Sequence, residues 1–175
     1  IWHKESLDML FATANTERMR LDSSGRLLVG QTSGLNLYAN GLFQVSATDG
    51  NAALAVNRWS NNSSSPYLNF GKSRSGTVGT YTIVQSGDRL GQINFTGADG
   101  TDLASSAAGI AAYVDGTPGS NDMPGRLVFF TASDDSAAET ERLSITSSGK
   151  VGIGTTAGLM DASGLTSELI VGIVT

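Results

Sequence analysis

The sequence contains no cysteine, a single histidine and three prolines. The absence of cysteine excludes disulfides, thiol nucleophiles and cysteine-ligated zinc in this chain. A catalytic triad or a histidine metal site would need the lone imidazole of His3, which lies near one end of the sequence, where chains are commonly disordered. We therefore expect no catalytic residue, no metal site and no cofactor.

Charge is also scarce, at 15% of residues against roughly 25% in an average globular domain. The net charge is −5, and the eleven lysines and arginines are scattered without a cluster. Nucleic-acid binding is disfavoured because it needs a concentrated basic face. No apolar run approaches the ~18 residues of a membrane span, so we expect no membrane insertion. The sequence begins without methionine or a signal peptide, which predicts a fragment of a longer chain.

What the sequence does contain is glycine, 22 residues of it, together with many small polar residues. This mixture favours turns and strands over helices. It also contains a repeat. "TERMRLDSSGRLLVGQT" at 16–32 and "TERLSITSSGKVGIGTT" at 140–156 align without gaps, with identical residues at eight of 17 positions. The chain therefore holds a repeated module.

The repeat is typical of two short strands around a tight turn. Leu143 and Ile145 alternate with polar residues, as Val151 and Ile153 alternate with glycines, which is the period of a half-buried strand. Gly149 lies between them, where a reversal can take a positive φ at little cost. The glycine spacing does not fit a dinucleotide-binding loop, and the following residues are a poor helix.

The repeat also divides the chain into modules. "LFATA" at 10–14 precedes the first copy as "VFFTA" at 128–132 precedes the second. We therefore expect 1–34 to be the C-terminal part of a preceding module, 35–156 a complete β-rich module that ends in the repeated hairpin, and 157–175 the start of a following segment.

Short apolar runs separated by Asp-Gly and Ser-Gly turn signals predict an all-β module. The predicted strands are 36–47, 52–60, 67–73, 81–85, 91–97, 109–115, 126–132, 142–146 and 150–154, with a weaker helical pattern at 101–112. Each strand carries only two or three large apolar side chains, worth ~1.5–3 kcal/mol each when buried, against roughly 1.5 kcal/mol of ordering cost per residue. This narrow margin predicts that identical chains close around an axis and share an interior.

Three stretches resemble one known module. "GDRLGQINFTGADGTD" at 87–102, "AGIAAYVDGTPGSNDMPGRLVFFTA" at 108–132 and "ETERLSITSSGKVGIGTT" at 139–156 are similar to the repeat module of tail fibre proteins of tailed bacteriophages, found upstream of a self-cleaving chaperone domain. The resemblance covers about 66–156, with a partial copy at 10–32. The sequence departs from the pattern after "VGIGTT", where "AGLMDASG" replaces a Ser-Pro step, and no cleavage motif is visible, so self-cleavage is not assigned.

The resemblance implies an extracellular virion component that serves as shaft or adhesin. Its fold would be an elongated, β-rich, fibre-like or sandwich-like module, and its chains would form an intertwined homotrimer. Its partners would be copies of itself, other virion tail proteins and a host cell-surface glycan. The alternatives are a tailspike-like polysaccharide depolymerase and a bacterial extracellular filament or adhesin module.

For glycan contact, the suggestive stretch is "NRWSNNSSSPYLNF" at 57–70. Sugars are held by aromatic stacking and planar polar donors, so the candidate glycan-binding residues are Arg58, Trp59, Asn61, Asn62 and Tyr67. The alternative is a polar loop whose aromatic side chains only anchor it to the core.

The aspartate pairs at 99 and 102 and at 134 and 135 raise a Ca²⁺ or glycosidase alternative. We favour turn roles for them, because aspartate before glycine is a common turn residue and "SDDS" at 133–136 is typical of a loop tip.

Overall fold

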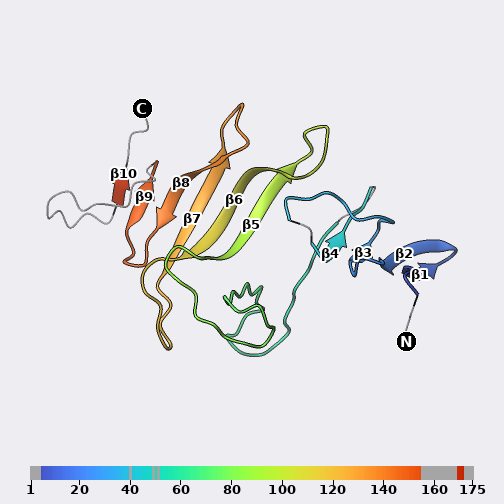
Figure 1. Cartoon of the computed structure of the whole chain (residues 1–175), viewed down its shortest axis with the longest axis horizontal. Coiled ribbons are helices and arrows are strands. Elements are labelled where there is room, and N and C mark those ends of the chain that lie inside the picture. The colour runs from blue at the N-terminus through green and yellow to red at the C-terminus, as the bar shows by residue number, and fades with distance from the viewer. Residues whose placement is uncertain (1–4, 40, 49, 51, 155–168, 172–175) are drawn as a thin grey trace. The chain divides into compact units, whose positions relative to one another are not determined.

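The computed structural model describes residues 5–39, 41–48, 50, 52–154 and 169–171, and every regular element within them is a β-strand (Figure 1). The strands form two sheets. No helix that could cross a membrane is found in this part of the chain. The predicted all-β class is confirmed. Contacts divide the chain into unit 1, Ile1–Leu68 with Ala98–Ala104, and unit 2, Asn69–Gly97 with Ser105–Thr175.

Unit 1 contains a four-stranded sheet in chain order. Its strands are β1 (Met9–Thr13), β2 (Thr16–Leu21), β3 (Leu27–Val29) and β4 (Phe43–Val45). β1 to β3 form an antiparallel meander, whereas β4 pairs with β3 in parallel. A parallel pair needs a crossover of about a dozen residues, which 30–42 supplies. The side chain of Gln44 in β4 fixes this crossover, because it accepts hydrogen bonds from Gln31 Nε2 at 2.7 Å and from the Leu35 amide at 3.1 Å.

Unit 2 contains a six-stranded sheet, also in chain order. Its strands are β5 (Arg89–Gly97), β6 (Ser105–Val114), β7 (Gly125–Ala132), β8 (Glu139–Ile145), β9 (Val151–Ile153) and β10 (Leu169–Val171). β5 to β9 are antiparallel, and β10 joins β9 in parallel, as β4 joins β3. Figure 1 shows β5 to β8 as a meander with long connecting loops.

The two copies of the repeat make corresponding hydrogen bonds in their turns. In the turn of the first copy, the Gly25 amide donates to Asp22 O at 2.9 Å, and in the second the Gly149 amide donates to Thr146 O at 3.0 Å. The φ angles of the two glycines are +78° and +79°, which confirms the positive φ predicted for Gly149. Both copies therefore use the same turn.

The strands before the turn also match. Arg18 Nε donates to Thr13 Oγ1 at 3.0 Å, and Arg142 Nε donates to Thr131 Oγ1 at 2.9 Å. A bulge interrupts β1–β2 after Phe11 and β7–β8 after the corresponding residue, Phe129. The two copies thus share a bulge, an arginine–threonine contact and a turn.

The core of unit 2 is small and lies on one face of the sheet. Ala111 and Val128 face each other directly across β6 and β7, and Phe130 packs beside them. Phe130 is only 5% exposed, and its cross-strand partner is Gly109. A glycine there leaves room for the phenyl ring, because an added Cβ would lie 2.3 Å from Phe130 Cζ. Small residues on β6 therefore create the space that the aromatic ring fills.

The opposite face of the unit 2 sheet carries a row that we call the apolar ladder. Its members lie directly opposite one another in β5 to β9: Ile93, Ile110, Phe129, Leu143 and Ile153. Directly opposed residues share a face of a sheet. None of the five is buried, and Ile93 is 43% exposed. These five apolar side chains of unit 2 are therefore at most partly covered by their own unit.

Unit 1 repeats this arrangement on its smaller sheet. A row of apolar residues crosses β1 to β4, and none of its members is buried: Phe11, Met19, Val29 and Val45. Met19 and Val29 correspond to Leu143 and Ile153 in the repeat. Each sheet thus leaves an equivalent apolar face open.

Several sequence-based expectations about elements are wrong. The stretches 52–60, 67–73 and 81–85 form no strand, and 36–47 forms one only at Phe43–Val45. These stretches have apolar side chains, but no neighbouring strand in their own chain pairs with them. The helical pattern at 101–112 is also wrong, because β6 begins at Ser105 and pairs on both sides, so tertiary pairing overrides a weak local preference.

Candidate functional site

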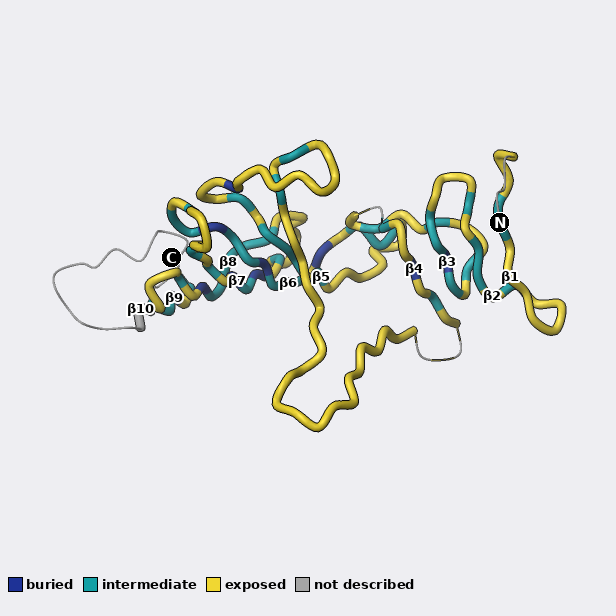
Figure 2. The backbone as a smooth tube through the Cα atoms, turned by 90° about the horizontal axis from the view of Figure 1, so that it is seen from below, coloured by how far each residue is buried: buried dark blue, intermediate teal, exposed yellow. Residues whose placement is uncertain are grey.

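The candidate glycan-binding residues lie in an exposed segment of unit 1 without regular structure. Every residue from 52 to 72 is exposed, and Figure 2 shows a long exposed run of backbone there. Trp59 is 89% exposed and Tyr67 is 75% exposed. The alternative in which these aromatic rings anchor the loop to the core is therefore wrong within this chain. Both rings are free to stack on a ligand.

Polar groups beside Trp59 are organised by Asn62. Its Oδ1 accepts hydrogen bonds from Ser60 Oγ at 3.1 Å, from the Ser64 amide at 3.0 Å and from Arg58 Nη2 at 3.4 Å. Arg58 Nε also donates to Ser60 Oγ at 3.1 Å. The contacts hold the guanidinium next to the indole-bearing residue. The structure thus brings Arg58 and Asn62 together through Ser60, which the sequence reasoning missed because serine is common throughout this stretch.

The segment is therefore suited to holding a neutral or acidic sugar. An exposed indole offers a face for the C–H surface of a pyranose, and the guanidinium and amide supply planar donors and an acceptor. Asn61 and Tyr67 are exposed on the same segment, without a contact that joins them to the Arg58–Asn62 group. The candidate site consists of one organised cluster and a second, separate aromatic side chain.

The aspartates that raised a metal or glycosidase alternative hold turns. Asp99 Oδ1 accepts the Thr101 amide at 2.8 Å, and Asp102 accepts the Ala104 amide at 2.8 Å and Asn36 Nδ2 at 2.6 Å. Asp134 Oδ1 accepts the amide of Asp135 at an exposed loop tip. Within the described ranges, no group of three potential ligands could hold a metal ion. His3 lies outside the described residues.

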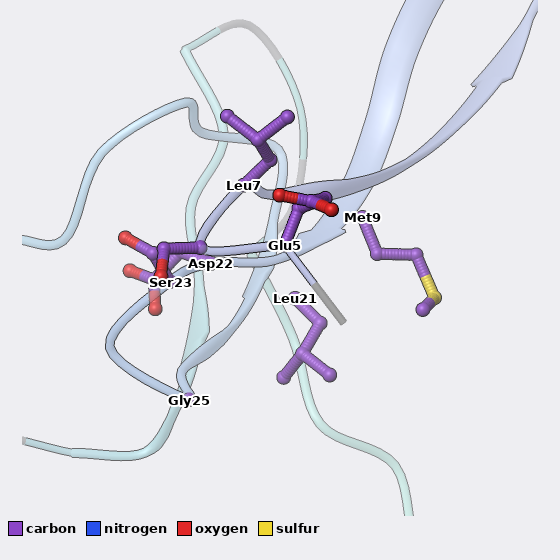
Figure 3. A pocket seen from close by; sticks show the side chains of 8 residues that line it. Glu5, Leu7, Met9, Leu21, Asp22, Ser23 and Gly25 are labelled. Atoms are coloured by element: carbon purple, nitrogen blue, oxygen red, sulfur yellow. The ribbon is translucent and has the colours of Figure 1, made fainter. Parts of the chain in front are cut away.

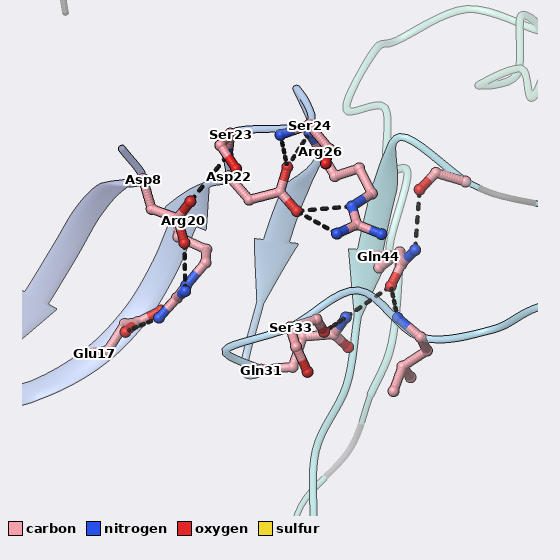
Figure 4. Close-up of polar contacts among 12 residues, drawn as sticks. Asp8, Glu17, Arg20, Asp22, Ser23, Ser24, Arg26, Gln31, Ser33 and Gln44 are labelled. Carbon is pink, nitrogen blue, oxygen red and sulfur yellow. Dashed lines mark hydrogen bonds and ion pairs between the residues drawn. The ribbon is translucent and has the colours of Figure 1, made fainter. Parts of the chain in front are cut away.

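Charged contacts in unit 1 lie along β2, just before β1 and in the turn between β2 and β3 (Figure 4). Arg20 lies between two carboxylates, with Nη1 2.5 Å from Asp8 Oδ2 and Nε 2.5 Å from Glu17 Oε1. The hydrogen bond from Arg20 lowers the pKa of Glu17. The backbone amide and then the guanidinium of Arg26 lower the pKa of Asp22. These carboxylates are held ionised by structural partners, which is not the arrangement of a general acid.

A comparable contact holds a loop in unit 2. Arg74 binds Asp88 through two hydrogen bonds of 2.6 Å. The Arg74 guanidinium holds the pKa of Asp88 well below its usual range, and the Gln85 amide adds to the effect. Ser73 closes the same loop, since its Oγ accepts the Thr82 amide at 3.0 Å. These contacts therefore hold the loop in a defined conformation.

Two pockets lie near the apolar faces. In unit 1, a pocket of about 450 Å³ is lined by Leu7, Met9 and Leu21, with Glu5 and Asp22 at its polar side (Figure 3). In unit 2, a smaller and more apolar pocket of about 290 Å³ is lined in part by Ile93 and Ile110 of the ladder. The lining of the first pocket includes two carboxylates, Glu5 and Asp22, whereas the lining of the second includes none.

No protein-family model and no curated protein matches the sequence. Several solved chains match the fold, among them two structures of one tail fibre. One is the carboxy-terminal domain of the bacteriophage T5 L-shaped tail fibre, with a TM-score of 0.63 and 16% identity over 85% of this chain. The other is that domain with its intramolecular chaperone domain, with a TM-score of 0.62 and 15% identity over 79% of this chain. The matches span 65% and 41% of those chains. The resemblance to a tail fibre is thus confirmed at the level of the fold.

Proposed function

We propose that this chain is a structural segment of a trimeric tail fibre on a phage virion, where it provides reach and attaches to the host surface. The observation that carries the proposal is the shared fold with a tail fibre domain over 85% of the chain. The repeated hairpin supports it, because a module that recurs along one chain builds length. In this role the chain is non-enzymatic and works outside the cell, bound to other virion tail proteins.

Immunogold electron microscopy tests the virion role. Antibodies raised against the purified chain should label the tail fibres of phage particles whose genome encodes the sequence. Labelling of filaments on the bacterial surface, with none on particles, would overturn the proposal in favour of a bacterial adhesin module.

For host attachment, we propose that the segment around Trp59 contacts a surface polysaccharide. Its exposed indole and the neighbouring Arg58–Asn62 group support this assignment. Three such sites on a trimeric fibre, and several fibres on one particle, would bind with an avidity far above the affinity of each site. Weak single contacts are therefore sufficient.

Binding of the purified chain to an array of bacterial O-antigens and capsular polysaccharides tests this part. Trp59→Ala should weaken binding about tenfold, the effect of losing an aromatic contact worth ~1.4 kcal/mol. Tyr81→Ala is the matched control, because Tyr81 is 93% exposed on a different loop. Equal binding by both variants would exclude the Trp59 segment.

The enzymatic alternative is separated by product analysis. The chain incubated with each polysaccharide that it binds should release no new reducing ends. Steady release, lost when one carboxylate is changed to its amide, would establish a depolymerase and overturn the non-enzymatic role.

A further inference from the structure

The two faces of the unit 2 sheet differ in how well their apolar side chains are covered. On the covered face, Ala111, Val128 and Phe130 are buried. On the ladder face, large side chains such as Ile93 and Ile153 are 43% and 40% exposed. A monomeric protein buries its large apolar side chains and rarely exposes a contiguous apolar patch of this kind. We propose that the ladder is the face on which copies of this chain pack against one another around a common axis.

The width of the ladder indicates whether a single strand or a whole sheet covers it. Neighbouring strands lie ~4.8 Å apart, so a row across five strands is roughly 19 Å wide. A single bound peptide strand covers about a quarter of that width. Another sheet covers all of it, since sheets pack face to face with interdigitating side chains. The partner is therefore a sheet.

Two observations favour a second copy of the chain as the source of that sheet. The ladder contains no charged residue, so copies with a net charge of −5 can approach there without bringing like charges together. The same apolar face is also open on the sheet of unit 1, at repeat-related residues such as Met19 and Val29. A second copy of the chain contains both copies of the repeat. It therefore offers an apolar sheet face for each of the two apolar faces of the first copy.

This inference names the interface of the trimer in the proposed function and rests on that function for the number of copies. Light scattering after gel filtration should give three times the chain mass of 18.1 kDa. Ile93→Asp should reduce the mass to that of one chain, because it would place a carboxylate from every copy at the shared interior. Asn94→Asp is the matched control, since it adds the same charge to the next residue of β5 on the opposite face, and it should keep the full mass.

Cross-linking adds a readout that does not depend on destabilisation. The chain has no cysteine, so a single introduced thiol reports one position. Phe129→Cys, on the ladder, should form covalent dimers in high yield under mild oxidation or with a short bis-maleimide. Arg126→Cys lies on the other face of β7 and should form no covalent dimers. Far-UV circular dichroism of each variant, matched to the parent chain, shows that the fold is retained.

The outcomes separate this inference from the proposed function. A trimer that survives Ile93→Asp and does not cross-link through Phe129→Cys would overturn the ladder assignment while leaving the trimeric fibre in place. A parent chain that stays at 18.1 kDa at high concentration would overturn both the ladder and the trimer. Dissociation by Asn94→Asp to the same degree as by Ile93→Asp would also contradict the ladder, because the effect would not depend on the face.

Discussion

Alanine at position 109 should destabilise unit 2 more than the addition of a single methyl group suggests. An added Cβ would lie 2.3 Å and 2.5 Å from ring carbons of Phe130 and 2.7 Å from the Ile93 carbonyl oxygen. Real Cβ atoms essentially never approach other atoms within 3.0 Å, so something must move. The carbonyl belongs to the β5–β6 pairing and the ring fills the core, so neither can yield cheaply. Overpacking of this kind costs about 1–3 kcal/mol.

Thermal unfolding followed by circular dichroism measures this cost. For a chain of this length, 1 kcal/mol corresponds to roughly 2–4 °C, so Gly109→Ala should lower the Tm by ~2–12 °C. Gly97→Ala is the matched control, because Gly97 is also in β5–β6 pairing and its added Cβ would meet nothing within 4 Å. The control should change the Tm by less than about 2 °C. Equal Tm values for the two variants would refute the argument that a glycine is needed at position 109 for the Phe130 ring to fit.

Three further predictions follow from local geometry. Gly149→Ala and Gly25→Ala should each cost ~1–2 kcal/mol of unfolding free energy, measured by chemical denaturation, because both glycines have a φ near +79° that an L residue pays to adopt. Asp88→Asn should speed hydrogen exchange at the Arg74 and Thr82 amides, because it removes the carboxylate that holds this loop. Since the Asp88 pKa is lowered in the folded state, the protection should be complete above pH ~4 and be lost only as the pH falls through the lowered pKa.

Each of these has an outcome that contradicts it. A cost at only one of the two glycines would show that the two turns are not equivalent. Unchanged exchange in Asp88→Asn, or protection that rises as the pH falls, would show that the arginine contact does not hold the loop.

The sequence predicts the strands best where a neighbouring strand lies nearby in the chain. The repeated hairpin, with its alternating Leu143 and Ile145 and its turn glycine, is present as expected. β6 is only partly predicted, because its alanines and serines have a weak preference of their own. Its strand is determined by pairing with β5 and β7, and the reason for Gly109 is visible only once Phe130 lies across it.

The candidate site is predicted less completely than the fold. The choice of Arg58, Trp59 and Asn62 rested on residue types, and the structure shows the contact between Arg58 and Asn62. Residue types alone could not show that Asn62 organises the segment, because the backbone conformation determines which donors reach its side-chain oxygen. Tyr67 was grouped with Trp59 by closeness in sequence, whereas the structure provides no contact that joins the two.

The uncovered ladder shows what a sequence pattern leaves open. The row from Ile93 to Ile153 predicts burial, but a pattern of burial does not say which chain provides the cover. Each hairpin strand pairs with a neighbour only a few residues away in the chain. For the ladder, nothing within the described part of unit 2 supplies the cover, although β5 to β9 each pair with their neighbours in the sheet. Such a sheet removes its apolar face from water when that face packs against another sheet.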